Sequence, residues 1–137
     1  MNNIRNSSIN VLLIEDNPGD ARLVQEFLHE GNPQEQEFEV TSVERLSDGI
    51  EKLKTNDFNN FDVVILDLNL PDSAESYTFR KIKTISPNIP VVILTGSAIK
   101  RTPLKECLDN AESYLVKSDI DSKSLVSATL KALEGKK

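Results

Sequence analysis

Residues 61–72 read FDVVILDLNLPD, and this stretch decides the fold. Four apolar residues, Val63 to Leu66, follow one another without interruption and lead directly to Asp67. A short run rich in β-branched side chains is typical of a parallel strand that is buried on both faces. Asp is also a common turn residue, so a turn alone would explain one strand that ends on Asp. The rest of the sequence has to show whether Asp67 has a further role.

Apolar runs of this kind alternate with helical patterns along the chain. Strands are expected at Ile9 to Ile14, Phe38 to Thr41, Phe61 to Leu66, Pro90 to Leu94 and Ser113 to Val116. Helices are expected from Asn17-Pro18 to Gly31, around Leu46 to Leu53, over roughly Ser73 to Ser86, from Ile99 to Leu108, and around Val126 to Leu133. Strands joined through helices form a parallel sheet with helices on both faces.

The sequence therefore predicts an α/β fold, a doubly wound parallel sheet of five strands with five helices. No repeat, linker or low-complexity segment divides the chain, so residues 1–137 are expected to form one domain with a core of about 9–133. If the strand order is the flavodoxin-like 2-1-3-4-5, strands one and three are neighbours at the point where the order reverses. Ligands bind at this point in open sheets, outside the carboxyl ends of the strands.

The composition excludes several kinds of function. The formal net charge is −6, which argues against nucleic acid as a partner, because phosphate contacts need a basic patch. His29 is the one histidine and falls within a helical pattern whose apolar face is Leu23, Val24, Phe27 and Leu28, so a surface position is expected rather than a Ser-His-Asp site.

The apolar pattern and the cysteine count bear on the cellular location of the protein. No apolar run has the length of a membrane span, and the polar start MNNIRNSSIN lacks the apolar centre of a signal peptide. The single cysteine, Cys107, excludes an internal disulfide and suits a reducing compartment. A cytoplasmic protein without membrane contact is expected.

Acidic residues stand at the ends of two strands that the predicted order makes neighbours. Strand one leads into Glu15-Asp16 and strand three into Asp67. Crowded carboxylates repel and raise one another's pKa, so a cation is needed, and carboxylate oxygens suit Mg²⁺. Lys117 after strand five would add a fixed positive charge, and Thr95 after strand four a hydroxyl.

This set of groups fits transfer of a phosphoryl group onto a carboxylate, which requires charge neutralisation and positioning. Asp67 is central and is the expected acceptor, while the acidic pair would hold the metal together with the backbone carbonyl of Asn69. Thr95 and Lys117 would bind the phosphoryl oxygens. Each residue also has a structural explanation as a turn former, a helix-start acid or a surface lysine, but a joint fit by chance is far less common.

Four motifs occur in order: VLLIEDNPGD, VVILDLNLPDS, VVILTGS and SYLVKS. With these motifs the chain resembles the receiver domain of two-component response regulators. The resemblance implies that a histidine kinase or a histidine phosphotransfer protein phosphorylates Asp67 with Mg²⁺. It implies that Thr95 and Tyr114 form a switch: Thr95 and Lys117 move inward, Tyr114 rotates in, and the face of helix four, strand five and helix five changes its partner preference. The same face serves homodimers in the family.

Two positions depart from the family pattern. Ser118 replaces the proline that follows the lysine, so a trans bond and an altered loop are expected. Glu75 stands where the family has glycine, and it adds acidity near the site.

Only EGKK follows the last helix, which predicts a stand-alone receiver whose output is contact with a protein target. The PDS loop also resembles receivers paired with phytochrome-type or other sensor kinases.

Other readings of the same residues stay open. The domain can be a pseudo-receiver that binds without phosphorylation, although the acceptor, acidic pair and lysine are all present. A phosphatase with an aspartate nucleophile or a flavin carrier are further alternatives, the latter opposed by few aromatic residues and an acidic loop. Within the receiver reading, the chain is expected to be no enzyme in its own right, and it can signal to a target or act as a phosphate shuttle or sink.

Overall fold

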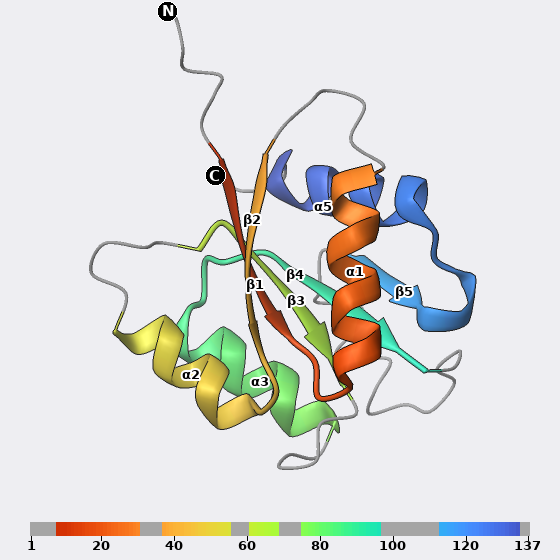
Figure 1. Ribbon diagram of the computed structural model, residues 1–137. Coiled ribbons are helices and arrows are strands. Elements are labelled where there is room, and N and C mark those ends of the chain that lie inside the picture. The colour runs from red at the N-terminus through yellow and green to blue at the C-terminus, as the bar shows by residue number, and fades with distance from the viewer. Residues whose placement is uncertain (1–7, 31–36, 56–60, 69–74, 97–112, 135–137) are drawn as a thin grey trace, which may run out of the picture.

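The computed structural model describes residues 8–30, 37–55, 61–68, 75–96 and 113–134 (Figure 1). The strands are β1 (Ile9–Ile14), β2 (Phe38–Val43), β3 (Val63–Asp67), β4 (Val91–Thr95) and β5 (Ser113–Val116). The helices are α1 (Pro18–Glu30), α2 (Leu46–Lys54), α3 (Glu75–Ile85) and α5 (Ser122–Glu134), with a 3₁₀ turn, η2 (Lys117–Asp119), after β5. None of the helices in this part of the chain combines the length and apolar character that a bilayer crossing requires.

The five strands form one parallel sheet in the order β2-β1-β3-β4-β5, as the sequence predicts. In the register of the sheet, Ile14 of β1 pairs with Leu66 of β3, and Asp67 pairs with Leu94 of β4. Thr95 pairs with Val116 of β5. The carboxyl ends of β1, β3, β4 and β5 therefore lie at one edge of the sheet, where the order reverses between β1 and β3.

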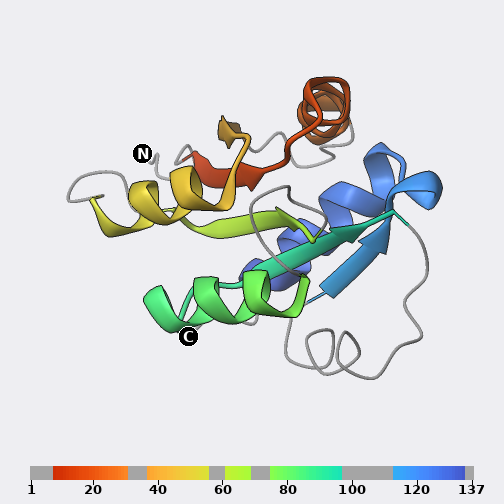
Figure 2. The same cartoon turned by 90° about the horizontal axis from the view of Figure 1, so that it is seen from below.

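Helices cover both faces of the sheet, with α2 and α3 on one side and α1 and α5 on the other (Figures 1 and 2). Alternate residues of each central strand belong to the two faces, so Val64 and Leu66 pack with α2 and α3 whereas Val63 and Ile65 pack with α1 and α5. Every residue of β3 and β4 is buried. This double burial explains why the central strands read as unbroken apolar runs.

The start of α1 has the cap that the sequence predicts. The side-chain Oδ1 of Asn17 accepts a hydrogen bond from the backbone N–H of Asp20 at 2.9 Å, and Pro18 occupies the first helical position. Asn at the cap and Pro at the first position both favour helix initiation. The chain therefore turns into α1 directly after Glu15 and Asp16 at the end of β1.

The structure corrects several details of the predicted elements. β2 continues to Val43, and β3 begins at Val63 and includes Asp67. Leu23, which was expected on the apolar face of the first helix, is 44% exposed, because Ala21, Val24 and Leu28 form the buried face of α1. His29 is exposed, as expected. The helix expected at Ile99 to Leu108 lies outside the described residues.

A close contact between α2 and β1 depends on Gly49. A Cβ atom at this position would meet Cδ1 and Cγ1 of Ile14, a fully buried side chain of β1. Gly weakens a helix interior by roughly 1 kcal/mol relative to Ala. Gly49 is therefore retained at a cost in helix propensity because α2 packs tightly against the end of β1 that leads into the acidic residues.

A double-mutant cycle tests this contact. We expect Gly49→Ala to lower the free energy of unfolding by about 1–3 kcal/mol, the usual effect of overpacking a core. Ile14→Val removes Cδ1, the atom closest to the new methyl group. In that background Gly49→Ala should be neutral or stabilising, and the coupling is read from urea unfolding of the four proteins. If the two substitutions changed the free energy of unfolding additively, the contact between position 49 and Ile14 would not be what restricts position 49 to glycine.

Candidate functional site

The carboxyl edge of the sheet brings together acidic side chains from β1, β3 and α1. Glu15 directly follows β1 and is fully buried, and Asp67 ends β3 with 1% of its surface exposed. Asp20 lies in the first turn of α1, and its side chain is 43% exposed. Buried carboxylates are costly unless they are paired, so this edge requires a positive partner.

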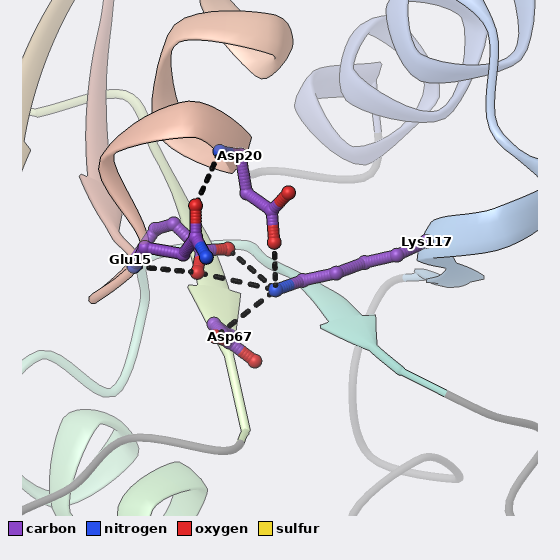
Figure 3. A network of polar contacts seen from close by, with 5 residues as sticks. Glu15, Asp20, Asp67 and Lys117 are labelled. Atoms are coloured by element: carbon purple, nitrogen blue, oxygen red, sulfur yellow. Dashed lines mark hydrogen bonds and ion pairs between the residues drawn. The ribbon is translucent and has the colours of Figure 1, made fainter.

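Lys117 supplies that positive charge (Figure 3). It stands at the start of η2, after β5, and its side chain points back across the ends of the strands toward the acids. Its Nζ lies 2.9 Å from Oε1 and 3.1 Å from Oε2 of Glu15, 3.0 Å from Oδ2 of Asp20 and 3.2 Å from Oδ2 of Asp67. One ammonium group thus ties together three elements that are far apart in the sequence.

Burial and mutual contact shift the pKa values of both Glu15 and Lys117. The pKa of Glu15 is raised to about 7, chiefly because burial removes the carboxylate from solvent and also because Asp67 is close, whereas the hydrogen bonds from Lys117 and the Asn17 N–H act in the opposite direction. Burial alone would lower the pKa of Lys117, but its contacts with Glu15, Asp20 and Asp67 together raise it above the ordinary value. Lys117 is therefore a permanent positive charge, while the acids still repel one another.

The acidic residues fit a divalent cation. One carboxylate oxygen from each of Glu15, Asp16 and Asp67 lies within 4.8 Å of the others. Within the described residues, Oε1 of Glu15 is buried and accepts no hydrogen bond, although it lies 2.9 Å from the ammonium of Lys117. Hard oxygen ligands of this kind suit Mg²⁺, which binds them at about 2.1 Å. These three residues could hold such an ion.

The remaining predicted site residues lie on the neighbouring strands. Thr95 ends β4 and is 4% exposed, one strand away from Asp67. Tyr114 on β5 is 44% exposed, so its ring is at the surface. Ser118 lies in the η2 turn and is exposed. Asn69, whose carbonyl was expected at the metal, lies outside the described residues, as does the side chain of Glu75 at the start of α3.

Sequence reasoning missed Asp20. Asp20 belongs to the motif VLLIEDNPGD and to the predicted helix start, but the predicted site residues are those that follow the strands, and Asp20 lies in the first turn of α1. The signal that could have found it is the cap geometry, because an Asn17-Pro18 helix start places the side chain of the third helical residue above the end of β1. The contact with Lys117 itself joins residues 97 positions apart and is visible only in the structure.

The fold and this edge define a doubly wound α/β domain with an acidic site and the permanent positive charge of Lys117 beside it. The sequence matches the response regulator receiver domain family over residues 11–129. The chain therefore belongs to the response regulator receiver domain family, and it is the receiver domain of a two-component response regulator. The strand order and the buried acid at the end of β3 agree with this assignment.

Individual relatives support the same assignment. The cell cycle transcriptional regulator CtrA of Caulobacter vibrioides is 31% identical over 107 residues, which are 78% of this chain and 43% of CtrA. The chain thus spans less than half the length of this relative. A receiver domain protein from Clostridium thermocellum superposes with a TM-score of 0.74 at 25% identity, covering 92% of this chain and 94% of the other.

A third similar structure is that of the phosphorylated cyanobacterial phytochrome response regulator RcpA. It superposes with a TM-score of 0.69 at 26% identity, and covers 93% of this chain and 92% of RcpA.

The raised pKa of Glu15 predicts a pH dependence of stability without divalent cations. Below pH 4.5 Glu15 is protonated in the folded and unfolded states, and above about pH 7 it is charged in both. Between these values only the folded state keeps the proton on Glu15. The stabilisation that this proton provides is therefore lost as the pH rises toward 7. In EDTA, Glu15→Gln should therefore raise the melting temperature at pH 8 and change it little at pH 4.

The control is Glu51→Gln, which removes an exposed carboxylate from α2. It should leave the melting temperature nearly unchanged at both pH values. Added Mg²⁺ should stabilise the wild-type protein more than Glu15→Gln, because a bound ion stabilises the folded state by mass action. A Glu15→Gln protein that is destabilised in EDTA at pH 8 would show that the carboxylate is fully compensated by Lys117.

Proposed function

We propose that this receiver accepts a phosphoryl group on Asp67, with Mg²⁺, from a histidine kinase or a histidine phosphotransfer protein. The single observation that carries the proposal is the contact between Lys117 Nζ and the buried Oδ2 of Asp67 at 3.2 Å, next to Glu15 and Asp16. A buried acid at a sheet edge, with a fixed cation and metal ligands around it, is arranged to receive an anionic group.

The transfer step uses the Asp67 carboxylate as nucleophile. A carboxylate oxygen forms a bond to phosphorus while the P–N bond of the phosphohistidine breaks, and the electron pair stays on the imidazole nitrogen of the donor. Bound Mg²⁺ supplies positive charge that offsets the repulsion between the phosphoryl oxygens and the acids. Lys117 donates to a phosphoryl oxygen, and the hydroxyl of Thr95 on the adjacent strand donates to another.

Phosphorylation would then be read out through the side of the domain that contains β5 and α5. The outward position of Tyr114 fits the unphosphorylated state of a two-state switch, in which movement of Thr95 toward the phosphoryl group opens space for the ring. Output is contact with a protein target, and the helix expected at residues 99–108 would share this face. The same face can also form a homodimer.

The likeness to known receivers favours a signalling role over catalysis on a separate substrate. Phosphorylated RcpA is a phytochrome response regulator, and we extend to this chain the proposal of a sensor kinase as phosphodonor. The receiver assists its own phosphorylation and dephosphorylation and is no enzyme beyond that. A cytoplasmic location follows from the reducing environment that suits Cys107 and from the need to meet the kinase.

Two alternatives within this family remain as competing proposals. In a phosphorelay the domain would pass the phosphoryl group on, as a shuttle or sink, and its aspartyl phosphate would be short-lived or readily transferred to a second histidine. In a pseudo-receiver the fold binds a partner without phosphorylation. The complete set of Glu15, Asp16, Asp67 and Lys117 around one point favours a working acceptor over the pseudo-receiver.

Intact mass spectrometry with a small phosphodonor tests the proposal. Wild-type protein incubated with acetyl phosphate and Mg²⁺ should gain one phosphoryl group, and EDTA should prevent the gain. Asp67→Asn should form no adduct, and Lys117→Ala should form it at least about tenfold more slowly, since one stabilising electrostatic contact typically contributes that much or more.

Asp62→Asn is the matched control, because Asp62 lies at the opposite end of β3 and its carboxylate accepts from the backbone N–H of Asn10. It should be phosphorylated like the wild type. An adduct that persists in Asp67→Asn would exclude Asp67 as the acceptor. A folded wild-type protein that binds Mg²⁺ but gains no mass from acetyl phosphate or phosphoramidate would favour the pseudo-receiver.

A further inference from the structure

Asp20 is the third acid that contacts the ammonium group of Lys117, besides Glu15 and Asp67. Asp20 projects from the first turn of α1, and its Oδ2 lies 3.0 Å from Nζ, closer than the 3.2 Å of Asp67 (Figure 3). Its backbone is fixed by the cap at Asn17, whose Oδ1 accepts from the Asp20 N–H. The side chain is therefore held over the site by the same turn that starts the helix.

The ammonium group of Lys117 has three protons to donate. The hydrogen bonds to Glu15, Asp20 and Asp67 engage all three. A phosphoryl oxygen on Asp67 can therefore be bound by Lys117 only if one of these contacts is released. The donor supply of a single ammonium limits what the site can hold at one time.

The three contacts differ in how costly they are to release. Glu15 is fully buried and its Oε2 also accepts from the N–H of Asn17 at 3.2 Å, but loss of the ammonium would still remove the positive charge beside a buried carboxylate, which is unfavourable. Asp67 is the acceptor itself and stays beside the phosphoryl group. The side chain of Asp20 is 43% exposed, so water can solvate its carboxylate when the contact with Lys117 breaks. Exposed ion pairs of this kind contribute little to the free energy of folding. Asp20 is therefore the partner that leaves when a phosphoryl group arrives.

We propose that Asp20 is a positioning residue that competes with the phosphoryl group for Lys117 and so restrains phosphorylation of Asp67. This inference rests on the proposed function. In the resting domain Asp20 holds the ammonium on the α1 side of the acids, and this contact must open during transfer. Asp20 also adds negative charge near the incoming anion, which acts in the same direction.

Phosphorylation rates of Asp20→Asn test the proposal. The variant keeps the size of the side chain and frees one donor of Lys117. With phosphoramidate at saturating Mg²⁺, the P–N bond breaks, nitrogen leaves with its electron pair as ammonia, and an oxygen of Asp67 bonds to phosphorus. The rate of adduct formation by intact mass should rise roughly two- to fivefold, the range that one partly exposed ion pair carries.

The control is Asp119→Asn, which removes an exposed carboxylate two residues from Lys117. Among the described residues it is not one of the three acids that contact the ammonium. It should be phosphorylated at the wild-type rate. This comparison separates the specific contact from a general loss of negative charge.

A nitrogen NMR signal of the Lys117 ammonium provides a second measurement that does not depend on phosphorylation. It should shift, and its protons should exchange faster with water, in Asp20→Asn but not in Asp119→Asn. If Asp20 merely stabilised the first turn of α1, the melting temperature would fall slightly while the signal and the rate stayed unchanged.

A rate in Asp20→Asn that equals or falls below that of the wild type would overturn the inference, while the wild-type adduct would still support phosphorylation of Asp67. An unchanged ammonium signal would overturn it as well. If the wild type forms no adduct, the proposed function fails, and the competition between Asp20 and a phosphoryl group fails with it.

Discussion

The site depends on one interaction, the ion pair of the Lys117 ammonium with the buried carboxylates of Glu15 and Asp67. Without it, two buried carboxylates would lie close together at the sheet edge with no positive charge beside them, and removing one partner of a buried ion pair is strongly unfavourable. The ammonium offsets this cost in part, since the pKa of Glu15 is still raised to about 7. The remaining excess of negative charge is the feature on which the proposed binding of a cation, and of a phosphoryl group with it, depends.

The fold is what places these charges together. Two apolar layers bury both faces of the sheet, so a slip of one residue would move the core side chains of a central strand into the opposite layer, where they do not fit the packing. The parallel register then fixes where each strand ends, with Asp67 opposite Leu94 and Thr95 opposite Val116. Core packing thus determines the position of the polar groups at this edge.

Much of this arrangement could be predicted from the sequence, because each central strand is a short apolar run followed by a polar residue. That pattern indicated a parallel sheet and, once the flavodoxin-like strand order was assumed, it placed Glu15, Asp67, Thr95 and Lys117 at one edge. It could not give the role of Asp20, since that depends on the path of a long lysine side chain across three strands. The sequence also misplaced Leu23. The apolar residues of α1 span a wider face than the sheet covers, so Ala21 and Val24 are buried and Leu23 is left exposed to solvent.

The central claim, that this edge holds a phosphoryl group on Asp67 between Mg²⁺ and Lys117, is tested most directly by a crystal structure with Mg²⁺ and beryllofluoride, a mimic of the phosphoryl group. The account predicts beryllium bonded to a carboxylate oxygen of Asp67, Mg²⁺ on Glu15 or Asp16, and Lys117 and Thr95 donating to fluorine atoms. Beryllofluoride on another residue, or Mg²⁺ bound with Asp67 left unmodified, would contradict it.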